Sequence, residues 1–334
     1  MKHSHGNSFS ATRRHVLRVA TAALPAAIGL PSFAQGSSAP VKLVVGYPPG
    51  GLTDSIARVL AERLQDELKR TVLVENRPGA GARVAAAAFR RLPADGDHIM
   101  LNTDSLIVQA PLVFRSLPFD VFTDFTPLSM VAQFAYAFAT GSNPKVETLA
   151  QYVDWLRKNP AQANFGHPAP GSAPHFYGLM FGEKIGVPMT PVPYQGGAPM
   201  LAALAGGQIS AALNAVAVDM VEMHRSGRTR IVAVSGDKRV PQLSEVPTVV
   251  ELGYPSVPRG WAALYLPAGA PPAVVGRLNS AVAAVLANQD VRARLAGFGL
   301  DPGGSSAESL AATMRADFAV WRPIIAASGF KLDS

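Results

Sequence analysis

The stretch KLVVGYPPGGLTDSIARVLAERLQDELK, residues 42–69, joins a short apolar run to a longer amphipathic one through a glycine-bearing loop. The run Lys42–Tyr47 has the apolar, β-branched composition of a strand. In Asp54–Lys69, leucine or isoleucine recurs every fourth residue, as on one face of a helix. Since a strand followed by a helix is the repeating unit of a mostly parallel sheet covered by helices, this stretch predicts an α/β fold.

The same alternation of β-rich runs and amphipathic segments continues along the chain. Further strands are predicted at Thr71–Glu75, His98–Asn102, Thr126–Val131, Ala135–Thr140, Asn164–Gly166, Met189–Pro193, Ala211–Asn214 and Ile231–Val234. Helices are predicted at Val84–Arg91, Thr148–Asn159, His175–Ile185, from Pro199, and at Val216–Ser226, Pro271–Asn288, Asp290–Gly297 and Ala307–Ser328.

The number of residues and the order of these elements indicate two lobes. About 300 residues follow residue 34, which is more than one hydrophobic core usually organises. The C-terminal helices bring no long strands of their own, so they are expected to pack on the first lobe. We therefore predict a first lobe from residues 41–135 and 262–334 and an inserted second lobe from residues 136–261. Two chain crossings between the lobes form a hinge.

The loop between the first strand and the first helix has the chemistry of an anion site. Glycines at positions 50 and 51 allow backbone N–H groups to approach a ligand closely, and Asp54 is placed to cap a helix whose N-terminal partial charge attracts anions. The spacing matches neither GxGxxG nor the Walker A motif, so a nucleotide is not indicated. The alternative is an ordinary tight turn between strand and helix.

Two more glycine-bearing loops follow probable strands and precede helices. They are GHPAPGSAPH at residues 166–175 and YQGGAP at residues 194–199. Loops of this kind lie at the carboxyl edges of the strands, where open α/β sheets bind ligands. The three loops together predict a ligand site between two sheets.

A hydrolase is the alternative from another functional class. Ser172 and His175 are three residues apart, so a hydroxyl and an imidazole could share a helix face. However, the G-x-S-x-G elbow is absent and no acidic residue nearby is placed to orient the imidazole. The sequence has no cysteine, and the histidines after residue 34 do not have the spacing of a metal site, so we expect no metal and no cofactor.

The first 34 residues have the pattern of an export signal. The pair Arg13-Arg14 precedes an apolar, alanine-rich run from Val19 to Leu30, and Ser32-Phe33-Ala34 supplies the small residues that a signal peptidase requires. We predict export to the periplasm by the twin-arginine route, with Gln35 as the mature N-terminus. A retained N-terminal anchor is the alternative, although the run is shorter than the roughly 20 residues of a membrane-spanning helix.

The net charge of +7 depends strongly on this segment. It contains four basic residues and no acidic one, so the remainder carries +3. Basic residues do not cluster after it and aromatic residues are not interleaved with them, so nucleic-acid binding is not expected. The mild positive balance favours small anions.

Several longer segments resemble one family in the same order along the chain. They include VENRPGAGARVAAAAF, PADGDHIML, VPYQGGAPMLAALAGGQI and RIVAVSGDKRVPQLSEVPTVVELGYP. The chain is similar over residues 41–333 to the tripartite tricarboxylate transporter solute receptors, also called Bug proteins. This resemblance implies a periplasmic-binding-protein fold of type II that captures a small carboxylate between two lobes and presents it to a membrane permease of the tripartite tricarboxylate type.

The resemblance also implies the ligand-binding residues. The family's carboxylate site falls on Gly50, Gly51, Thr53, Asp54, Thr103, Asp104, Ser105, Gly171, Ser172, His175, Tyr194, Gly196 and Gly197, with Tyr47 at the wall of the site. Two segments depart from the family pattern, Leu106–Pro111 and Asn214-Ala215, and Asp104 introduces a further acidic group. The identity of the ligand therefore cannot be copied from a relative.

The expected function is that of a monomeric exported receptor for a small organic carboxylate. A periplasmic sensor that feeds a signalling system would have the same fold and the same kind of site. Sensing and transport thus remain alternatives at the level of the sequence, and the hydrolase is the third.

Overall fold

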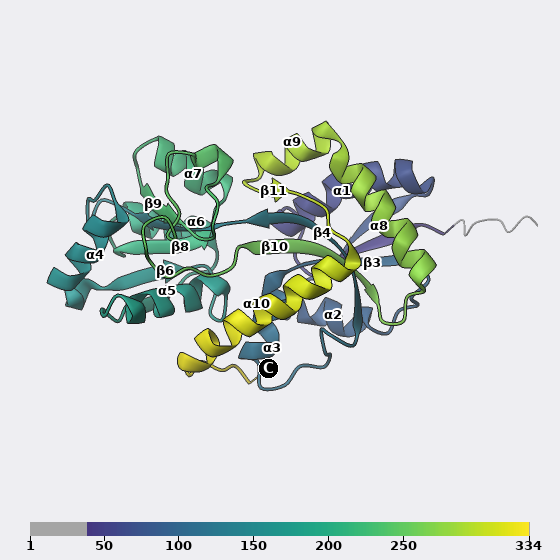
Figure 1. The fold of residues 1–334 in the computed structure, drawn as a ribbon, viewed down its shortest axis with the longest axis horizontal. Coiled ribbons are helices and arrows are strands. Elements are labelled where there is room, and N and C mark those ends of the chain that lie inside the picture. Colours follow the sequence, from purple (N-terminus) through teal and green to yellow (C-terminus); the bar gives the residue numbers. More distant parts are fainter. Residues whose placement is uncertain (1–38, 334) are drawn as a thin grey trace, which may run out of the picture. The chain divides into compact units, whose positions relative to one another are not determined.

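The computed structural model describes residues 39–333, which are built around a sheet of six strands and a sheet of five (Figure 1). The α/β class and the arrangement of two βα lobes joined by two crossings agree with the prediction. The predicted signal segment lies outside the described residues. No helix within residues 39–333 has the length and apolar character that crossing a membrane requires.

The six-stranded sheet, with its helices, is called lobe one. Its strands are β1 (Val41–Val45), β2 (Val72–Asn76), β3 (His98–Thr103), β4 (Phe125–Phe134), β10 (Gly260–Pro267) and β11 (Asp301–Pro302), in the spatial order β11-β4-β10-β3-β1-β2. Strand β1 pairs in parallel with β2 and β3, whereas β10 is antiparallel to both β3 and β4. The carboxyl ends of β1 and β3 therefore lie at the same edge of the sheet.

Two groups of helices pack on this sheet. They are α1 (Leu52–Leu68), α8 (Pro272–Ala287) and α9 (Gln289–Gly297), which pack against one another, and α2 (Arg83–Phe89), α3 (Ala110–Val113) and α10 (Ala307–Ala327). Two of them begin at residues with strong capping side chains. Asn288 accepts N–H groups at the start of α9, and Ser306 accepts that of Ser309 at the start of α10.

The five-stranded sheet, with its helices, is called lobe two. Its strands are β5 (Tyr136–Thr140), β6 (Asn164–His167), β7 (Thr190–Pro193), β8 (Ala211–Ala215) and β9 (Arg230–Val234), in the order β7-β6-β8-β5-β9. Its helices are α4 (Leu149–Lys158), α5 (Ala173–Lys184), α6 (Gly197–Ala205) and α7 (Val218–Arg225). Strands β6, β7 and β8 are parallel, so their carboxyl ends also share one edge.

Two segments connect the lobes. Strand β4 leads through Ala135 directly into β5, and the chain returns after β9 to enter β10 at Gly260. A Cβ atom at Gly260 would lie 2.1 Å from the Phe134 ring and 2.7 Å from the Tyr136 hydroxyl. A residue without a side chain is required here because the two crossing strands approach so closely.

The hydrophobic core follows the two crossings. One cluster of buried residues fills lobe one and continues onto the face of the smaller sheet that carries α4 and α5. A second cluster lies beneath α6 and α7. All eight residues of β10 are buried, which explains their nearly continuous apolar character.

The structure differs from the sequence prediction at two places near the site. Helix α1 begins at Leu52, two residues before the predicted start. Residues 105–113 form a π-helical turn, Ser105–Gln109, followed by α3, and no helix was predicted there. The residues Leu106, Ile107 and Val108 are all buried, so the segment lacks the one-sided hydrophobic period that identifies a surface helix. The predicted lobe boundaries at residues 135/136 and 261/262 stay a prediction.

Candidate functional site

The loop between β1 and α1 is organised by the carboxylate of Asp54. One oxygen accepts the N–H of Gly50 and the Nε of Arg58, each at 2.9 Å. The other accepts the side-chain amide of Asn76 at 2.9 Å, and the same amide donates to the Tyr47 carbonyl at 3.1 Å. The loop is thus tied to the end of β2 and to the second turn of α1.

These contacts change the role expected of Asp54. The prediction that Asp54 caps α1 is wrong, since the N-cap residue is Gly51 and no side chain caps it. The hydrogen bond from Arg58, with those from Gly50 and Asn76, lowers the pKa of Asp54 to about 2. The carboxylate is 2% exposed and its oxygens are already engaged. It positions the loop, and a direct contact with a ligand stays a prediction.

Gly50 and Gly51 are glycines for different reasons. Gly50 has a φ of +84°, which L side chains rarely adopt. Gly51 has an ordinary φ of −79°, and a Cβ there would meet only the Pro48 carbonyl at 3.7 Å. The first N–H groups of α1, next to Gly51 and Thr53, have no partner within the helix, which makes this end of α1 suited to an anion.

The loop after β3 meets the β1–α1 loop and the hinge. The Tyr47 hydroxyl lies within hydrogen-bonding reach of Thr103, and burial raises the pKa of Tyr47. Asp104 accepts the hydroxyl of Tyr136 at 2.9 Å and the amide of Gln109 at 3.4 Å. Because Tyr136 is the first residue of β5, Asp104 connects the β3 loop of lobe one to the start of lobe two.

Asp104 belongs to a buried acidic pair at the crossing strands. Burial raises the pKa of Asp104 to about 7 and the pKa of Asp317 to about 6. Asp317 accepts the indole N–H of Trp261 at 2.8 Å, and the backbone N–H of Trp261 bonds to Asp104. Asp104 is 4% exposed, so its first role in the structure is to hold the hinge strands together.

The loop between β6 and α5 is built around two stacked histidines. The rings of His167 and His175 lie 4.5 Å apart at an angle of 17°. Gly171 donates its N–H to Nδ1 of His175 at 3.2 Å, and Nδ1 of His167 donates to the Ala169 carbonyl at 2.9 Å. Burial, together with the neighbouring His167, lowers the pKa of His175 to about 4, so the ring is neutral at pH 7.

This geometry does not form a nucleophile–base pair. The Ser172 hydroxyl donates to the Ala169 carbonyl at 2.7 Å, and Nδ1 of His175 is occupied by the N–H of Gly171. A catalytic serine requires its hydroxyl to donate to the imidazole. The structure therefore provides no support for the hydrolase alternative at these residues.

The third loop joins the second by backbone hydrogen bonds. Tyr194 donates its N–H to the His167 carbonyl at 3.0 Å, and Gly196 donates to the Pro168 carbonyl at 3.1 Å. A Cβ at Gly197 would lie 2.8 Å from the side-chain amide of Asn214, which places that amide beside the third loop. The two loops of lobe two thus form one surface at the carboxyl ends of β6, β7 and β8.

The segment after α10 supports the second loop, and the sequence analysis did not identify it. The Phe330 ring packs edge-on against His175 at 4.9 Å and lies 5.9 Å from Phe176. The backbone of Leu332 bonds on both sides to the α3 region, to Val113 and to Arg115. The C-terminal segment therefore contacts both lobe one and the β6–α5 loop of lobe two.

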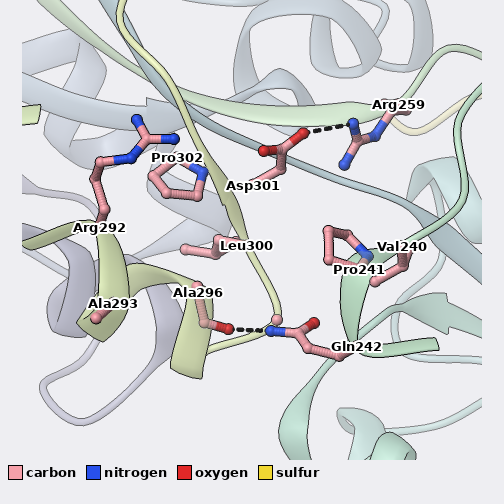
Figure 2. A pocket seen from close by; sticks show the side chains of 11 residues that line it. Val240, Pro241, Gln242, Arg259, Arg292, Ala293, Ala296, Leu300, Asp301 and Pro302 are labelled. Atoms are coloured by element: carbon pink, nitrogen blue, oxygen red, sulfur yellow. Dashed lines mark hydrogen bonds and ion pairs between the residues drawn. The ribbon is translucent and has the colours of Figure 1, made fainter. Parts of the chain in front are cut away.

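The predicted residues thus fall into two clusters, one on each lobe. Tyr47, the β1–α1 loop and the β3 loop form the first, and the loops of residues 166–175 and 194–199 form the second. No site for a metal ion built from three or more histidine, aspartate or glutamate side chains is found within residues 39–333. A pocket beside the hinge, drawn in Figure 2, is lined by none of the predicted residues. A ligand held between the two clusters stays a prediction.

Several known proteins are similar to this chain over most of its length. BugT of Bordetella pertussis (strain Tohama I) is 30% identical over 316 residues, covering 94% of this chain and 96% of BugT. The solved structure of R. palustris Rpa4515 with adipate is 31% identical with a TM-score of 0.78, covering 88% of this chain and 99% of that one. MatC from Rhodopseudomonas palustris with bound malate is 26% identical with a TM-score of 0.73, covering 87% of this chain and 100% of MatC.

The periplasmic binding protein BugD is also similar, at 28% identity and a TM-score of 0.73, over 87% of this chain and 98% of BugD. The family model described as the tripartite tricarboxylate transporter family receptor matches residues 56–330. Fold and sequence both agree with this match. The chain belongs to the tripartite tricarboxylate transporter receptor family, which includes the Bug proteins.

Proposed function

We propose that this chain is an exported receptor, without enzymatic activity, that binds a small carboxylate between its lobes and delivers it to a tripartite tricarboxylate-type permease. The observation that supports the binding site is the start of α1. There, Asp54 holds the loop in place, a Cβ at Gly51 would have no close neighbour, and the N-terminus of a 17-residue helix follows the carboxyl end of β1. The adipate and malate held by two similar structures support a carboxylate as ligand.

The two clusters complement each other chemically. Lobe one offers backbone N–H groups at a helix terminus, and lobe two offers backbone and side-chain groups of the loops at residues 171–175 and 194–197. The Asp54 carboxylate, fully engaged by its own chain, does not need a ligand to balance its charge. Binding then depends on both lobes, so ligand closes the hinge.

Calorimetry with malate and adipate tests the binding site. Gly51→Val is expected to abolish detectable binding because it adds bulk where the carboxylate approaches. The fold is expected to be retained, since φ is ordinary and a Cβ meets no close neighbour. Gly303→Val is the matched control, because a Cβ there meets nothing within 4 Å, and the one at Gly51 meets only the Pro48 carbonyl at an ordinary contact distance of 3.7 Å. If Gly51→Val bound these carboxylates with wild-type affinity, the ligand would not bind at this loop.

Export is tested separately from binding. Replacing Arg13 and Arg14 by lysine is expected to stop delivery to the periplasm, because the twin-arginine route reads this pair. Cell fractionation measures delivery, and mass analysis of the exported wild-type chain is expected to find Gln35 at its N-terminus. Normal delivery of the double variant would indicate the general secretory route instead.

A further inference from the structure

The pocket of Figure 2, of about 310 Å³, lies beside the hinge and has walls from both lobes. Lobe two contributes the segment after β9, and lobe one contributes α9 and β11. Arg259, the residue before β10, completes it. The lining residues are Val240, Pro241, Gln242, Arg259, Arg292, Ala293, Ala296, Gly299, Leu300, Asp301 and Pro302.

This pocket is distant in the fold from the predicted ligand loops. Its strand β11 is at one edge of the six-stranded sheet, whereas the β1–α1 loop follows a strand near the opposite edge. Strands β4, β10 and β3 lie between them in the sheet order. A molecule in this pocket would therefore not occupy the proposed carboxylate site.

The walls are held together by contacts between the two lobes. Arg259 donates from Nη1 to the Asp301 carboxylate at 3.0 Å, and the Gln242 amide donates to the Ala296 carbonyl. Gly299, with φ of +84°, lies so close to lobe two that a Cβ would be 2.7 Å from the Val216 carbonyl oxygen. These contacts between the lobes fix the positions of the pocket walls relative to one another.

The charges that line the pocket do not balance. Arg259 and Arg292 are cationic, and Asp301 is the single anionic residue of the lining. The Arg259 side chain is 9% exposed, so its charge is poorly screened by water. Arg292 makes no side-chain hydrogen bond or ion pair within residues 39–333 and is exposed at the rim. The lining therefore carries one positive charge in excess.

The remainder of the lining is mainly apolar. Val240, Pro241, Ala293, Leu300 and Pro302 surround the charged groups. A volume near 300 Å³ is at the lower end of the range for small-molecule sites. The combination suits a small molecule with one negative charge and an apolar body.

We propose that this pocket is a second ligand site, which binds a small monocarboxylate with an apolar body. The carboxylate accepts N–H groups of the Arg259 guanidinium that Asp301 leaves free, and Arg292 adds its charge at the rim. A guanidinium has five N–H donors, so one carboxylate partner does not exhaust it. The apolar body packs against Leu300 and the two prolines.

Crystals grown with 4-bromobenzoate test this assignment directly, because the anomalous signal of bromine locates the molecule. The signal is expected between Arg259 and Leu300. Calorimetry with benzoate is expected to show that Arg292→Glu binds about tenfold more weakly than wild type, by charge reversal at the rim. Arg259→Lys, which retains the charge and loses the fork of donors, is expected to bind at least as weakly.

Two controls separate this site from the proposed carboxylate site. Gly51→Val is expected to leave benzoate binding in the hinge pocket unchanged. Arg277→Glu, an exposed charge reversal on α8, is the matched control for Arg292→Glu. The proposal is overturned if bromine is found elsewhere, if benzoate does not bind at 10 mM (a concentration on the order of ten times a weak, ~1 mM Kd), or if Arg292→Glu and Arg259→Lys bind like wild type.

Discussion

The β1–α1 loop of lobe one and the β6–α5 loop of lobe two are both glycine-bearing connections from a strand to a helix, but they are held in different ways. The first is held by one ionised carboxylate, Asp54, through hydrogen bonds to residues of the same βαβ unit. The second is held by stacked, neutral rings and by Phe330 from the far end of the chain. Similar loop sequences thus depend on polar contacts in one lobe and on aromatic packing in the other.

This difference predicts which changes destabilise each loop. A loop organised by a buried carboxylate depends strongly on that single group, because all of its donors lose their anionic acceptor when the charge is removed. A loop supported by ring packing depends on several contacts of moderate strength. It also depends on the protonation of its histidines, which are neutral when buried.

Removal of the Asp54 charge is expected to have the largest effect. Asp54→Asn leaves the donors of Gly50, Arg58 and Asn76 without an anionic acceptor, so the free energy of unfolding is expected to fall by about 2–3 kcal/mol. Affinity for the carboxylate is expected to fall more than tenfold. Urea unfolding and calorimetry measure the two effects.

The control for this variant is on the same helix. Asp66 is 62% exposed and lies 3.9 Å from Arg63, so Asp66→Asn is expected to change stability by less than about 0.5 kcal/mol. Equal effects of Asp54→Asn and Asp66→Asn would show that the Asp54 network does not hold the loop.

Acidification is expected to have the next largest effect, and to destabilise the two loops in different pH ranges. Because the pKa of His175 is lowered to about 4, the folded protein holds fewer protons there than the unfolded chain, and stability is lost as the pH falls from about 6.5 towards 4. The pKa of Asp54 is lowered to about 2, so its contribution is lost only as the pH falls below about 4. Hydrogen exchange, corrected for the intrinsic pH dependence, is expected to show residues 167–175 losing protection between pH 7 and 5 while residues 46–54 retain it.

A variant without the titrating ring sharpens this comparison. His175→Asn places an amide oxygen near the position of Nδ1, so it retains an acceptor for the N–H of Gly171, but it does not take up a proton in this range. Its exchange in residues 167–175 is expected to vary less with pH than that of the wild type. Simultaneous loss of protection in both loops of the wild-type protein would contradict the difference in their chemistry.

Loss of the aromatic support is expected to have the smallest effect. Phe330→Ala removes the ring that packs on His175 and Phe176, and a cost of about 1–2 kcal/mol is expected because Phe330 is only partly buried. Exchange in residues 167–175 is expected to become faster, with no change in residues 46–54.

Phe122→Ala provides the matched aromatic deletion. Phe122 also makes an edge-on contact, with Phe318 at 5.4 Å, but it does not contact the β6–α5 loop. Its removal is expected to leave exchange in both loops unchanged. If the two phenylalanine variants had the same effect on residues 167–175, the C-terminal segment would not be a specific support.

The sequence by itself determined the α/β class, most of the strands and helices, the three glycine-bearing loops and the resemblance to the receptor family. It did not identify strand β10, Gly260–Pro267, which follows a proline-rich irregular stretch. The features that it did determine are local: a hydrophobic period, a glycine or a capping residue acts within a few positions of the chain. The helical segment at residues 105–113 was missed for a related reason. Its residues are buried on all sides, so they show no one-sided period.

Only the tertiary structure decided which side chains hold the loops. Asn76 meets Asp54 across 22 positions and Tyr136 meets Asp104 across 32, and the C-terminal Phe330 packs on His175. It also showed that Asp54 does not cap α1, and it placed Arg259 and Arg292 at one pocket. No local pattern encodes such pairs, because they arise when β1 is placed beside β2, when the hinge strands cross, and when the last helix returns to the second lobe.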